Sequence, residues 1–381
     1  LDANNPFTFL GIEMIMRPNG DILLHQRTFI DSLLEKYGLS RLKGNTTVQI
    51  DKLPDEKIPS AAELKKLQTH SGEFNWLATR TRLDLSYYTS LLASASCKHA
   101  GWCIELVNKI LRFLVSSRDQ GIVISCSGDL NDLVAWSDAG YAGSDTKSQS
   151  GLVISFGGSI IVWRSSRQAV STLSTAEAEL NAATLAWQIC EGVRLLIGDL
   201  GIQIPRVRFL IDNKAALTIA ECGATWRTRY FATRAHRIHE EHVRGAAELV
   251  HCPTDKMIAD CLTKLATRPV IEITQQAMHG KLPEDLAPRT QAKHATSVDP
   301  GKENGADYTG DGPPPAKIHG TWTNPFVAGA VQSEPHTPTD DEIVPAEVHS
   351  PSPVTELELT DTEVPSPEVF PDSDLAVGGL P

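Results

Sequence analysis

Apolar residues change their spacing twice along the 381-residue chain, and these changes divide it into three regions. In the first, residues 1–125, a short strand near Phe9–Glu13 and a returning strand near Ile22–His25 flank a turn at Arg17–Gly20. Apolar residues then recur at helical spacing through about 29–37, 62–94 and 98–115. This region is therefore predicted to be mainly helical.

The second region, residues 130–268, begins with short segments rich in β-branched residues. Strands are predicted at 133–137, 151–156, 159–163, 207–211 and 248–252, and helices at 175–200, 214–221 and 255–265. Three strands in succession, followed by alternating helix and strand, are typical of an α/β fold with a mixed sheet. We therefore expect a mixed five-stranded sheet covered by helices.

The third region, residues 269–381, has no periodicity. Its last 101 residues, 281–381, contain 16 of the 23 prolines and 18 Asp or Glu residues against 5 Lys or Arg residues. The net charge of −12 comes from this stretch, because 29 acidic and 30 basic residues remain upstream. Such a composition buries too little apolar area to offset chain entropy, so a disordered tail is predicted. One hypothesis places the function in this tail, as an acidic segment that binds protein partners.

The seven cysteines are scattered and form no Cys-x-x-Cys pair. This pattern favours reduced thiols in a cytoplasmic or nuclear protein over a disulfide framework. No apolar run approaches the roughly 18–20 residues that span a bilayer, and no signal peptide is recognised, so neither membrane insertion nor secretion is expected. The first residue is Leu1, which we interpret as the start of a fragment of a longer protein.

Four carboxylates stand at the edges of predicted elements. They are Asp138 after the first strand of the sheet, Glu179 at the start of the long helix, Asp212 after the fourth strand and Asp260 in the last helix. If they converge, each close pair repels by about 4 kcal/mol at an effective dielectric near 20, so the cluster needs divalent cations. Mg²⁺ prefers such oxygen ligands. Two ions ~3.5–4 Å apart can orient a water and stabilise the leaving oxygen of a phosphodiester. These four residues are therefore the predicted metal ligands and catalytic residues.

The long helix offers two glutamates for this cluster. Ser174-Thr175-Ala176-Glu177 fits a capping box, in which Glu177 bonds back to the helix N-terminus. Glu179 instead lies on a face continued by alanines at 182, 183 and 186, whose small side chains let the helix approach the sheet. Glu179 is therefore predicted to join the cluster.

The four acids and the segments around them resemble the ribonuclease H domain of copia-type LTR-retrotransposon Pol polyproteins. The matching segments are Asp145–Gly151, Trp163–Gln168, Ser171–Glu179 and Ala259–Lys264. Residues 9–121 are similar to the C-terminal, thumb-like part of the copia-type reverse transcriptase, through Phe9–Glu13, Gln26, Thr81–Leu85 and Lys109–Leu114. The resemblance implies an endonuclease that uses two Mg²⁺ ions, or Mn²⁺ in their place, to hydrolyse the RNA strand of RNA/DNA hybrids during reverse transcription.

The same resemblance implies an upstream partner, the fingers and palm of the reverse transcriptase, and a location in a cytoplasmic virus-like particle or the nucleus. The Tyr-x-Asp-Asp motif of the polymerase is absent, so this chain is not expected to synthesise DNA by itself. Two segments depart from the family pattern. Arg82-Leu83-Asp84 replaces Arg-Pro-Asp, and Tyr230-Phe231-Ala232 replaces His-Ile-Asp. These departures keep an alternative open, a decayed or co-opted remnant that only binds nucleic acid or acts as a scaffold.

A basic and aromatic stretch precedes the fifth predicted strand. It contains Arg227, Arg229 and Arg234, interleaved with Trp226 and Tyr230. Guanidinium groups on phosphates and stacking rings suit a hybrid that is recognised by its shape, so these five residues are the predicted nucleic-acid contacts. The alternative is a solvated helix face. The histidines at 236, 239 and 242 would spread around a helix, and no Cys-x-x-Cys accompanies them, which argues against zinc.

Overall fold

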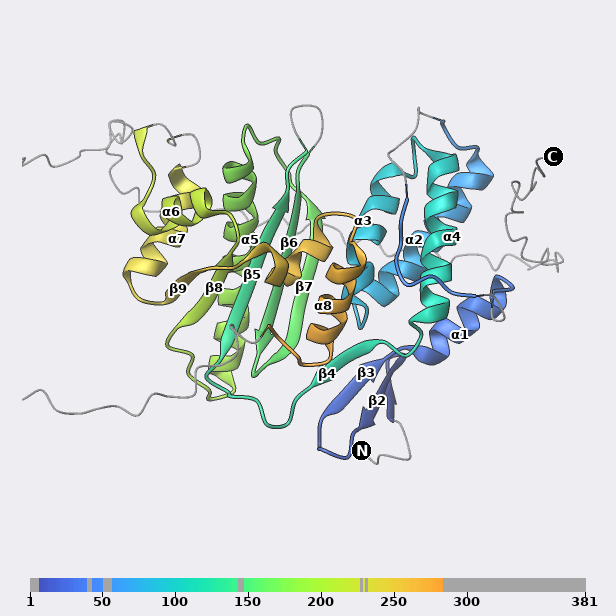
Figure 1. Cartoon of the computed structure of the whole chain (residues 1–381), viewed down its shortest axis with the longest axis horizontal. Coiled ribbons are helices and arrows are strands. Elements are labelled where there is room, and N and C mark those ends of the chain that lie inside the picture. The colour runs from blue at the N-terminus through green and yellow to red at the C-terminus, as the bar shows by residue number, and fades with distance from the viewer. Residues whose placement is uncertain are drawn as a thin grey trace, which may run out of the picture. The chain divides into compact units, whose positions relative to one another are not determined.

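The computed structural model describes residues 7–39, 43–50, 57–142, 147–226, 229 and 232–283, which all fall in one compact unit. The predicted tail beyond residue 283 lies outside the described residues. A four-stranded sheet and a five-stranded sheet organise this unit: helices flank the five-stranded sheet, and the small sheet lies at one end, below α1 and α4 in Figure 1.

The first region forms the smaller sheet and four helices. Its strands pair antiparallel in the order β1 (Phe7–Phe9), β2 (Ile12–Met16), β3 (Ile22–His25) and β4 (Gly121–Ile124). Between β3 and β4 the chain forms α1 (Arg27–Lys36), α2 (Ala61–Ala78), the 3-10 helix η1 (Leu83–Leu85), α3 (Ser86–Ala95) and α4 (Ala100–Ser116). The predicted helical segment over 62–94 is thus interrupted between Ala78 and Ser86, and β4 is a strand that the apolar pattern did not reveal.

The second region forms a mixed five-stranded sheet in the order β7-β6-β5-β8-β9, which confirms the predicted fold class. Strands β5 (Leu133–Gly140), β6 (Gln149–Phe156) and β7 (Ser159–Arg167) are antiparallel neighbours. Strands β8 (Val207–Ile211) and β9 (Ala247–His251) run parallel to β5. The helix α5 (Thr175–Asp199) connects β7 to β8, and α6 (Lys214–Cys222) and α7 (Ala232–Val243) connect β8 to β9.

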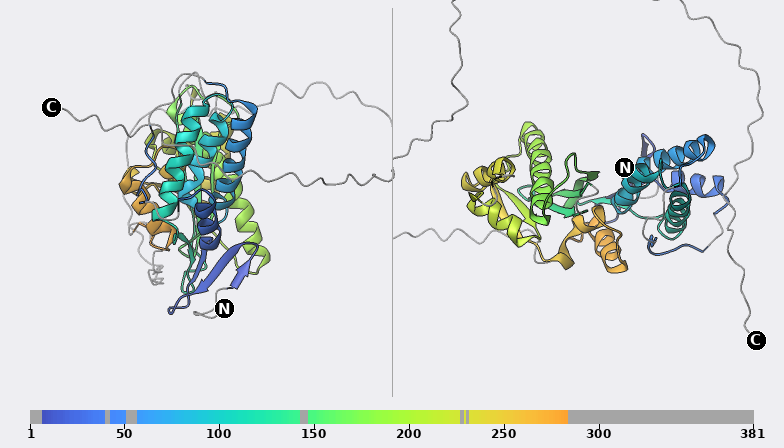
Figure 2. Two further views of the ribbon diagram at one scale, coloured as in Figure 1. Left: turned by 90° about the vertical axis from the view of Figure 1, so that its right-hand side faces the viewer. Right: turned by 90° about the horizontal axis from the view of Figure 1, so that it is seen from above.

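Alternate residues of the five-stranded sheet enter two different cores. The α5 face, which carries Ala135 and Phe209, packs against α5, α6 and α7. The α8 face, which carries Trp136 and Leu210, packs against residues after β9, the helix α8 (Arg268–Met278) and the helices of the first region. Helices α5 and α8 lie on opposite sides of the sheet when it is seen from above (Figure 2). The first two predicted regions therefore share one hydrophobic core.

The segment after β9 differs from the sequence prediction. The helix expected over 255–265 consists of two 3-10 helices, η3 (Thr254–Lys256) and η4 (Ile258–Leu262). Met257 separates them because its backbone is extended (φ −76°, ψ 93°). The folded part also continues beyond the boundary predicted at residue 268, because α8 follows and buries Ile271, Ala277 and Met278.

All seven cysteines are free thiols, and four of them, Cys103, Cys190, Cys252 and Cys261, are buried. No helix in the described part of the chain combines the length and the apolar character needed to cross a membrane.

Candidate active site

Two of the four predicted carboxylates lie side by side on neighbouring parallel strands. Strands β5 and β8 pair with Ser137 opposite Ile211, so Asp138 and Asp212 are adjacent. Asp212 directly follows β8, whereas Asp138 is still part of β5, opposite Gly151 of β6, because β5 extends beyond the strand predicted at 133–137. Asn213 then begins α6, because its side-chain oxygen accepts hydrogen bonds from the backbone N–H groups of Ala215 and Ala216, both at 3.0 Å. Asn213 thus provides the helix cap, and the Asp212 carboxylate is left for the site.

The turn η4 brings the third carboxylate to the same sheet edge. Oxygen atoms of Asp138, Asp212 and Asp260 lie within 4.8 Å of one another. Glycine allows this close approach: a Cβ at Gly151 would lie 2.7 Å from Thr263 Cγ2, and one at Gly140 would lie 2.5 Å from the Thr263 carbonyl oxygen. Side chains at these two positions would push η4, and with it Asp260, away from β5 and β6.

The two glutamates at the start of α5 lie in different surroundings, and only half of the predicted capping box forms. The Glu177 amide donates to Ser174 Oγ (3.2 Å), and the Glu177 carboxylate accepts from the Leu173 amide (2.8 Å), so Glu177 stabilises the helix start. Glu179 is 6% exposed and lies close enough to Asp138 and Asp212 to interact with their charges. The alanines that continue its face, 182, 183 and 186, are fully buried. Together these four acids form what we call the carboxylate cluster: Asp138, Glu179, Asp212 and Asp260.

The carboxylate cluster is electrostatically strained without cations. Burial, and next the charges of Asp138 and Asp212, raise the pKa of Glu179 to about 10. Burial and the Asp138 charge raise the pKa of Asp212 to about 6 and that of Asp260 to about 7. Desolvation penalises each charged form, and like charges add to the penalty.

Unpaired oxygen atoms in the cluster suit a hard divalent cation. Glu179 Oε2, Asp212 Oδ1 and Asp260 Oδ1 are buried and have no hydrogen-bond partner within the described residues. Leaving such an atom unpaired is costly. Oxygen-only donors from four carboxylates are the ligand type that Mg²⁺ and Mn²⁺ prefer. Among the described residues, the only His, Cys, Asp or Glu group close enough to hold a metal contains three of these acids.

Two neighbours of the cluster were not among the predicted site residues. The Thr263 hydroxyl donates to Asp138 Oδ2, and Lys264 Nζ lies 2.7 Å from Asp260 Oδ2. Both belong to the Ala259–Lys264 segment quoted for the family resemblance, which was the available signal. The resemblance included this segment but gave Thr263 and Lys264 no functional role.

The predicted nucleic-acid contacts are only partly described. Arg227 and Tyr230 lie outside the described residues. Trp226 is 76% exposed, and the Arg229 guanidinium carbon stacks 3.6 Å from the centre of its ring. Arg234 lies apart from this pair, on α7, where it lines a groove of about 370 Å³ between β7 and α5.

That groove is lined by basic, neutral polar and apolar side chains. Arg164 and Arg167 of β7 join Arg234, and among the described residues no carboxylate lines it. Its floor is held by buried Gln168, which donates to Ser150 Oγ (3.0 Å) and the Ala178 carbonyl (2.9 Å). Asn181 of α5, two residues beyond Glu179, donates to Gln168 Oε1 (3.1 Å). The groove therefore runs along the helix that carries Glu179. Arg164 and Arg167 are candidate anion contacts that the sequence analysis missed.

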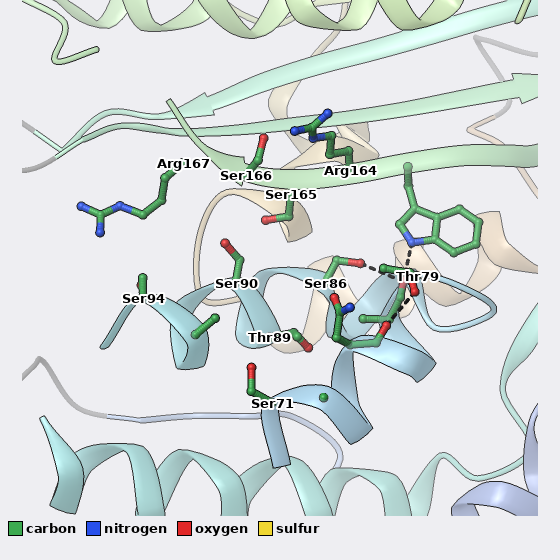
Figure 3. A pocket seen from close by; sticks show the side chains of 15 residues that line it. Ser71, Thr79, Ser86, Thr89, Ser90, Ser94, Arg164, Ser165, Ser166 and Arg167 are labelled. Carbon is green, nitrogen blue, oxygen red and sulfur yellow. Dashed lines mark hydrogen bonds between the residues drawn. The ribbon is translucent and has the colours of Figure 1, made fainter. Parts of the chain in front are cut away.

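A larger cavity of about 700 Å³ lies on the other side of β7, against α2 and α3 (Figure 3). Ser165 points toward α3, whereas Arg164 points to the opposite side of the strand (Figure 3). Gln149 bridges the two walls, donating to Ser90 Oγ (3.0 Å) and Ser165 Oγ (2.8 Å). Most hydroxyls here already donate to carbonyl groups, such as Ser165 to Leu262, whereas Arg164 and Arg167 line this cavity as well as the groove.

No protein-family model matches the chain. It is 28% identical over 271 residues to the retrovirus-related Pol polyprotein from transposon RE1 of Arabidopsis thaliana, and 29% identical over 269 residues to that from RE2. The Ty1-JR2 Gag-Pol polyprotein of Saccharomyces cerevisiae is 26% identical over 208 residues. These matches cover 69%, 68% and 53% of this chain, but only 18%, 18% and 12% of the relatives. The chain thus spans less than a fifth of the length of these proteins.

Similar solved structures cover about a third of the chain. One is LC11-RNase H1, isolated from compost by a metagenomic approach, at 19% identity and a TM-score of 0.29 over 35% of this chain and 93% of that one. The RNase H1 of Halobacterium salinarum gives 16% identity and a TM-score of 0.26 over 35% and 94%. LC11-RNase H1 in complex with an RNA/DNA hybrid gives 20% identity and a TM-score of 0.27 over 35% of this chain and 94% of that one.

By sequence, and over about half to two thirds of its length, this chain is a homologue of the copia-type Pol polyproteins of RE1, RE2 and Ty1.

Proposed function

We propose that this chain carries the ribonuclease H of a retrotransposon Pol polyprotein, which hydrolyses the RNA strand of RNA/DNA hybrids with two divalent cations, Mg²⁺ or Mn²⁺. The observation that carries the proposal is the carboxylate cluster, in which three members have a buried oxygen without a partner. Its sequence homology to Pol polyproteins supports reverse transcription as the setting.

The residues of the cluster would divide the work by position. Asp138, Asp212 and Asp260 would hold one cation between them, and Glu179 would complete the ligand set from α5. Bound cations would supply an oriented water as the nucleophile and charge stabilisation for the leaving 3′-oxygen. Thr263 orients Asp138 through its hydrogen bond to Oδ2. Because backbone pairing of β5 and β8 fixes Asp138 and Asp212, the ligand spacing is set by rigid elements.

Basic side chains beside the cluster would hold the hybrid. Arg164, Arg167 and Arg234 line a groove along α5 whose described lining residues include no acid. Guanidinium groups bind phosphate oxygens and position a duplex without reading its sequence. Arg229, with Trp226, offers a second contact at the start of α7. Arg227 and Tyr230, outside the described residues, remain predicted contacts.

The first region would connect the nuclease to the fingers and palm of the reverse transcriptase. Its helices supply Phe74, Leu92 and Leu106 to the same core that contains Trp136 and Leu210 of the sheet. In this proposal residues 1–125 are the C-terminal part of the reverse transcriptase, and residues 130–268 with α8 are the ribonuclease H. The protein would act in a virus-like particle or the nucleus.

Cleavage of a labelled hybrid by the whole chain tests the proposal, since a 126–270 fragment would lose part of the shared core. We expect RNA cleavage that needs Mg²⁺ or Mn²⁺, stops in EDTA and leaves 3′-hydroxyl ends. Asp138→Asn is the matched control, which should fold but not cut. Activity in excess EDTA, or 2′,3′-cyclic phosphate products, would contradict two-metal hydrolysis. Hybrid binding without cleavage would favour the decayed remnant.

A further inference from the structure

Lys264 is a cation at the edge of the carboxylate cluster. Its Nζ lies 2.7 Å from Asp260 Oδ2. The Asp260 side chain is 4% exposed, whereas that of Lys264 is 51% exposed. The carboxylate is therefore fixed inside the protein, while the ammonium group sits at the surface on a flexible four-carbon stem.

The backbone that carries Lys264 is held firmly, so only its side chain has freedom to move. Thr263, the preceding residue, bonds Asp138 and packs against Gly140 and Gly151 without space for a Cβ at either glycine. Its amide also bonds the Asp260 carbonyl (3.2 Å). These two consecutive residues therefore contact different carboxylates: the Thr263 hydroxyl is fixed against Asp138, and the Lys264 ammonium, on a flexible side chain, contacts Asp260.

The Lys264 ammonium competes with any cation for the same carboxylate. Its charge also interacts with Asp138 and Asp212, so it partly neutralises the cluster as a whole. A divalent cation bound to the free Oδ1 of Asp260 would neutralise the charge of the carboxylate that Lys264 contacts through Oδ2, and it would repel the ammonium. The nearest suitable new partner is then an anion arriving at the site, and a phosphodiester is such an anion.

We propose that Lys264 is an exchangeable counter-ion: it pairs with Asp260 in the metal-free protein and moves to a substrate phosphate when a divalent cation takes the carboxylate. The proposal rests on the proposed function for its substrate, but the exchange with metal is a property of the cluster alone. Lys264 is then a phosphate-binding residue whose engagement is coupled to metal loading.

Mn²⁺ titration calorimetry on the whole chain tests the exchange. Lys264→Met removes the competing charge and should tighten Mn²⁺ binding by about five-fold. Lys264→Arg, which keeps the charge, should bind Mn²⁺ nearly as the wild type does. Lys109→Met is the matched control, since it removes another ion-paired lysine, the partner of Glu105 on α4. Unchanged or weaker Mn²⁺ binding by Lys264→Met would overturn the proposal. Lys264→Gln gives a second neutral variant if Lys264→Met does not fold.

Hybrid binding tests the second half of the exchange. In a Glu179→Gln background, which prevents turnover, Lys264→Met should reduce the slope of log affinity against log salt by about 0.9 when Mg²⁺ is present. In EDTA, Lys264→Met should leave the slope unchanged. In Mg²⁺, Lys264→Arg should have the same slope as a protein with Lys264. An equal change in both conditions would overturn metal-coupled movement. If the wild type cuts no hybrid, the proposed function fails, while the Mn²⁺ titration still decides the exchange.

Discussion

The two faces of the five-stranded sheet are completed in different ways. The α5 face is covered by helices that lie between β7 and β9 in the sequence. The α8 face is covered by segments from both flanks, the first region and residues 258–278. The carboxylate cluster lies where the two faces meet, because Glu179 comes from α5 and Asp260 from η4. The site therefore depends on both faces, although only one of them is a local product of the sequence.

The largest expected effect comes from removing the carboxylate that each face supplies. Glu179→Gln and Asp260→Asn should each lower hybrid cleavage by more than about 100-fold, because even groups outside the ligand shell cost 10–100-fold. Glu177→Gln is the matched control on the same helix. It should keep activity and lower the free energy of unfolding by about 0.5–2 kcal/mol, as a weakened cap. Single-turnover cleavage measures the effect on activity, and thermal unfolding measures the effect on stability. If Glu177→Gln abolished cleavage and Glu179→Gln only lowered stability, the roles assigned to the two glutamates would be reversed.

Two neighbouring core residues on β8 allow the contribution of each face to stability to be compared directly. Phe209 enters the α5 face and Leu210 the α8 face, and both are fully buried. Phe209→Ala should lower the free energy of unfolding by about 3–5 kcal/mol and Leu210→Ala by about 2–5 kcal/mol. Hydrogen exchange should then accelerate in α5 for the first variant and in α3 and α4 for the second. Unchanged protection of α3 and α4 in Leu210→Ala would show that the first region folds without this face.

In the metal-free protein, Asp260 and Glu179 should affect stability over different pH ranges. Asp260, with its pKa raised to about 7, keeps a proton that the unfolded chain loses near pH 4, so stability falls as pH rises from about 4 to 7. Glu179, with its pKa raised to about 10, continues this fall above pH 7. In EDTA, Asp260→Asn should make the fall in melting temperature between pH 4 and 7 shallower, because Glu179 and Asp212 still contribute there, and Glu179→Gln should remove the fall between pH 7 and 9.

Mg²⁺ provides the control for these pH profiles. It binds the ionised carboxylates, so its addition should remove the fall in the wild type, and its apparent affinity should rise with pH through 6–7. A wild-type melting temperature in EDTA that rises with pH over this range would contradict the raised pKa values.

The smallest expected effect concerns the two sides of the edge strand β7. Arg164 and Ser165 are neighbours that point to opposite sides of it (Figure 3). Arg164→Ala should flatten the salt dependence of hybrid binding by about 0.9 in slope, as one lost phosphate contact. Ser165→Ala should leave that slope unchanged, since its hydroxyl donates to the Leu262 carbonyl. If the serine variant changes the slope, the hydroxyl-lined cavity is the phosphate-binding side.

Local sequence patterns were sufficient for the α5 face and much of the site. The predicted strand at 207–211 has the observed bounds of β8, and α5 begins at the predicted Thr175, because these elements have regular apolar patterns and a clear cap. Asp138, Glu179 and Asp212 converge because β5, the start of α5 and the end of β8 are neighbours in the fold, and η4 adds Asp260. The roles of Asp138, Glu179, Asp212 and Asp260 stay predictions.

The packing of the α8 face could not be predicted from local sequence patterns, because its contacts join residues that are far apart in the sequence. Nothing in the spacing near Leu92 or Leu106 indicates packing with Trp136. The apolar positions of α8, such as Ile271 and Met278, are few and border the acidic, proline-rich sequence, which favoured assigning them to the tail. Lys264 was missed for a different reason: it lies four residues after Asp260, a spacing that the predicted helix over 255–265 would also bring together, but the sequence analysis assigned it no role.

The position of α8 at the end of the described chain also sets a time order for protein synthesis. Asp138 leaves the ribosome 140 residues before Met278, the last residue of the helix that covers the α8 face. At 5–20 residues per second, this interval is roughly 7–28 s. The small sheet is complete once β4 has emerged, whereas the core beneath the carboxylate cluster must wait for α8. If the chain acts as proposed, a nascent chain could therefore cleave no hybrid until α8 has emerged.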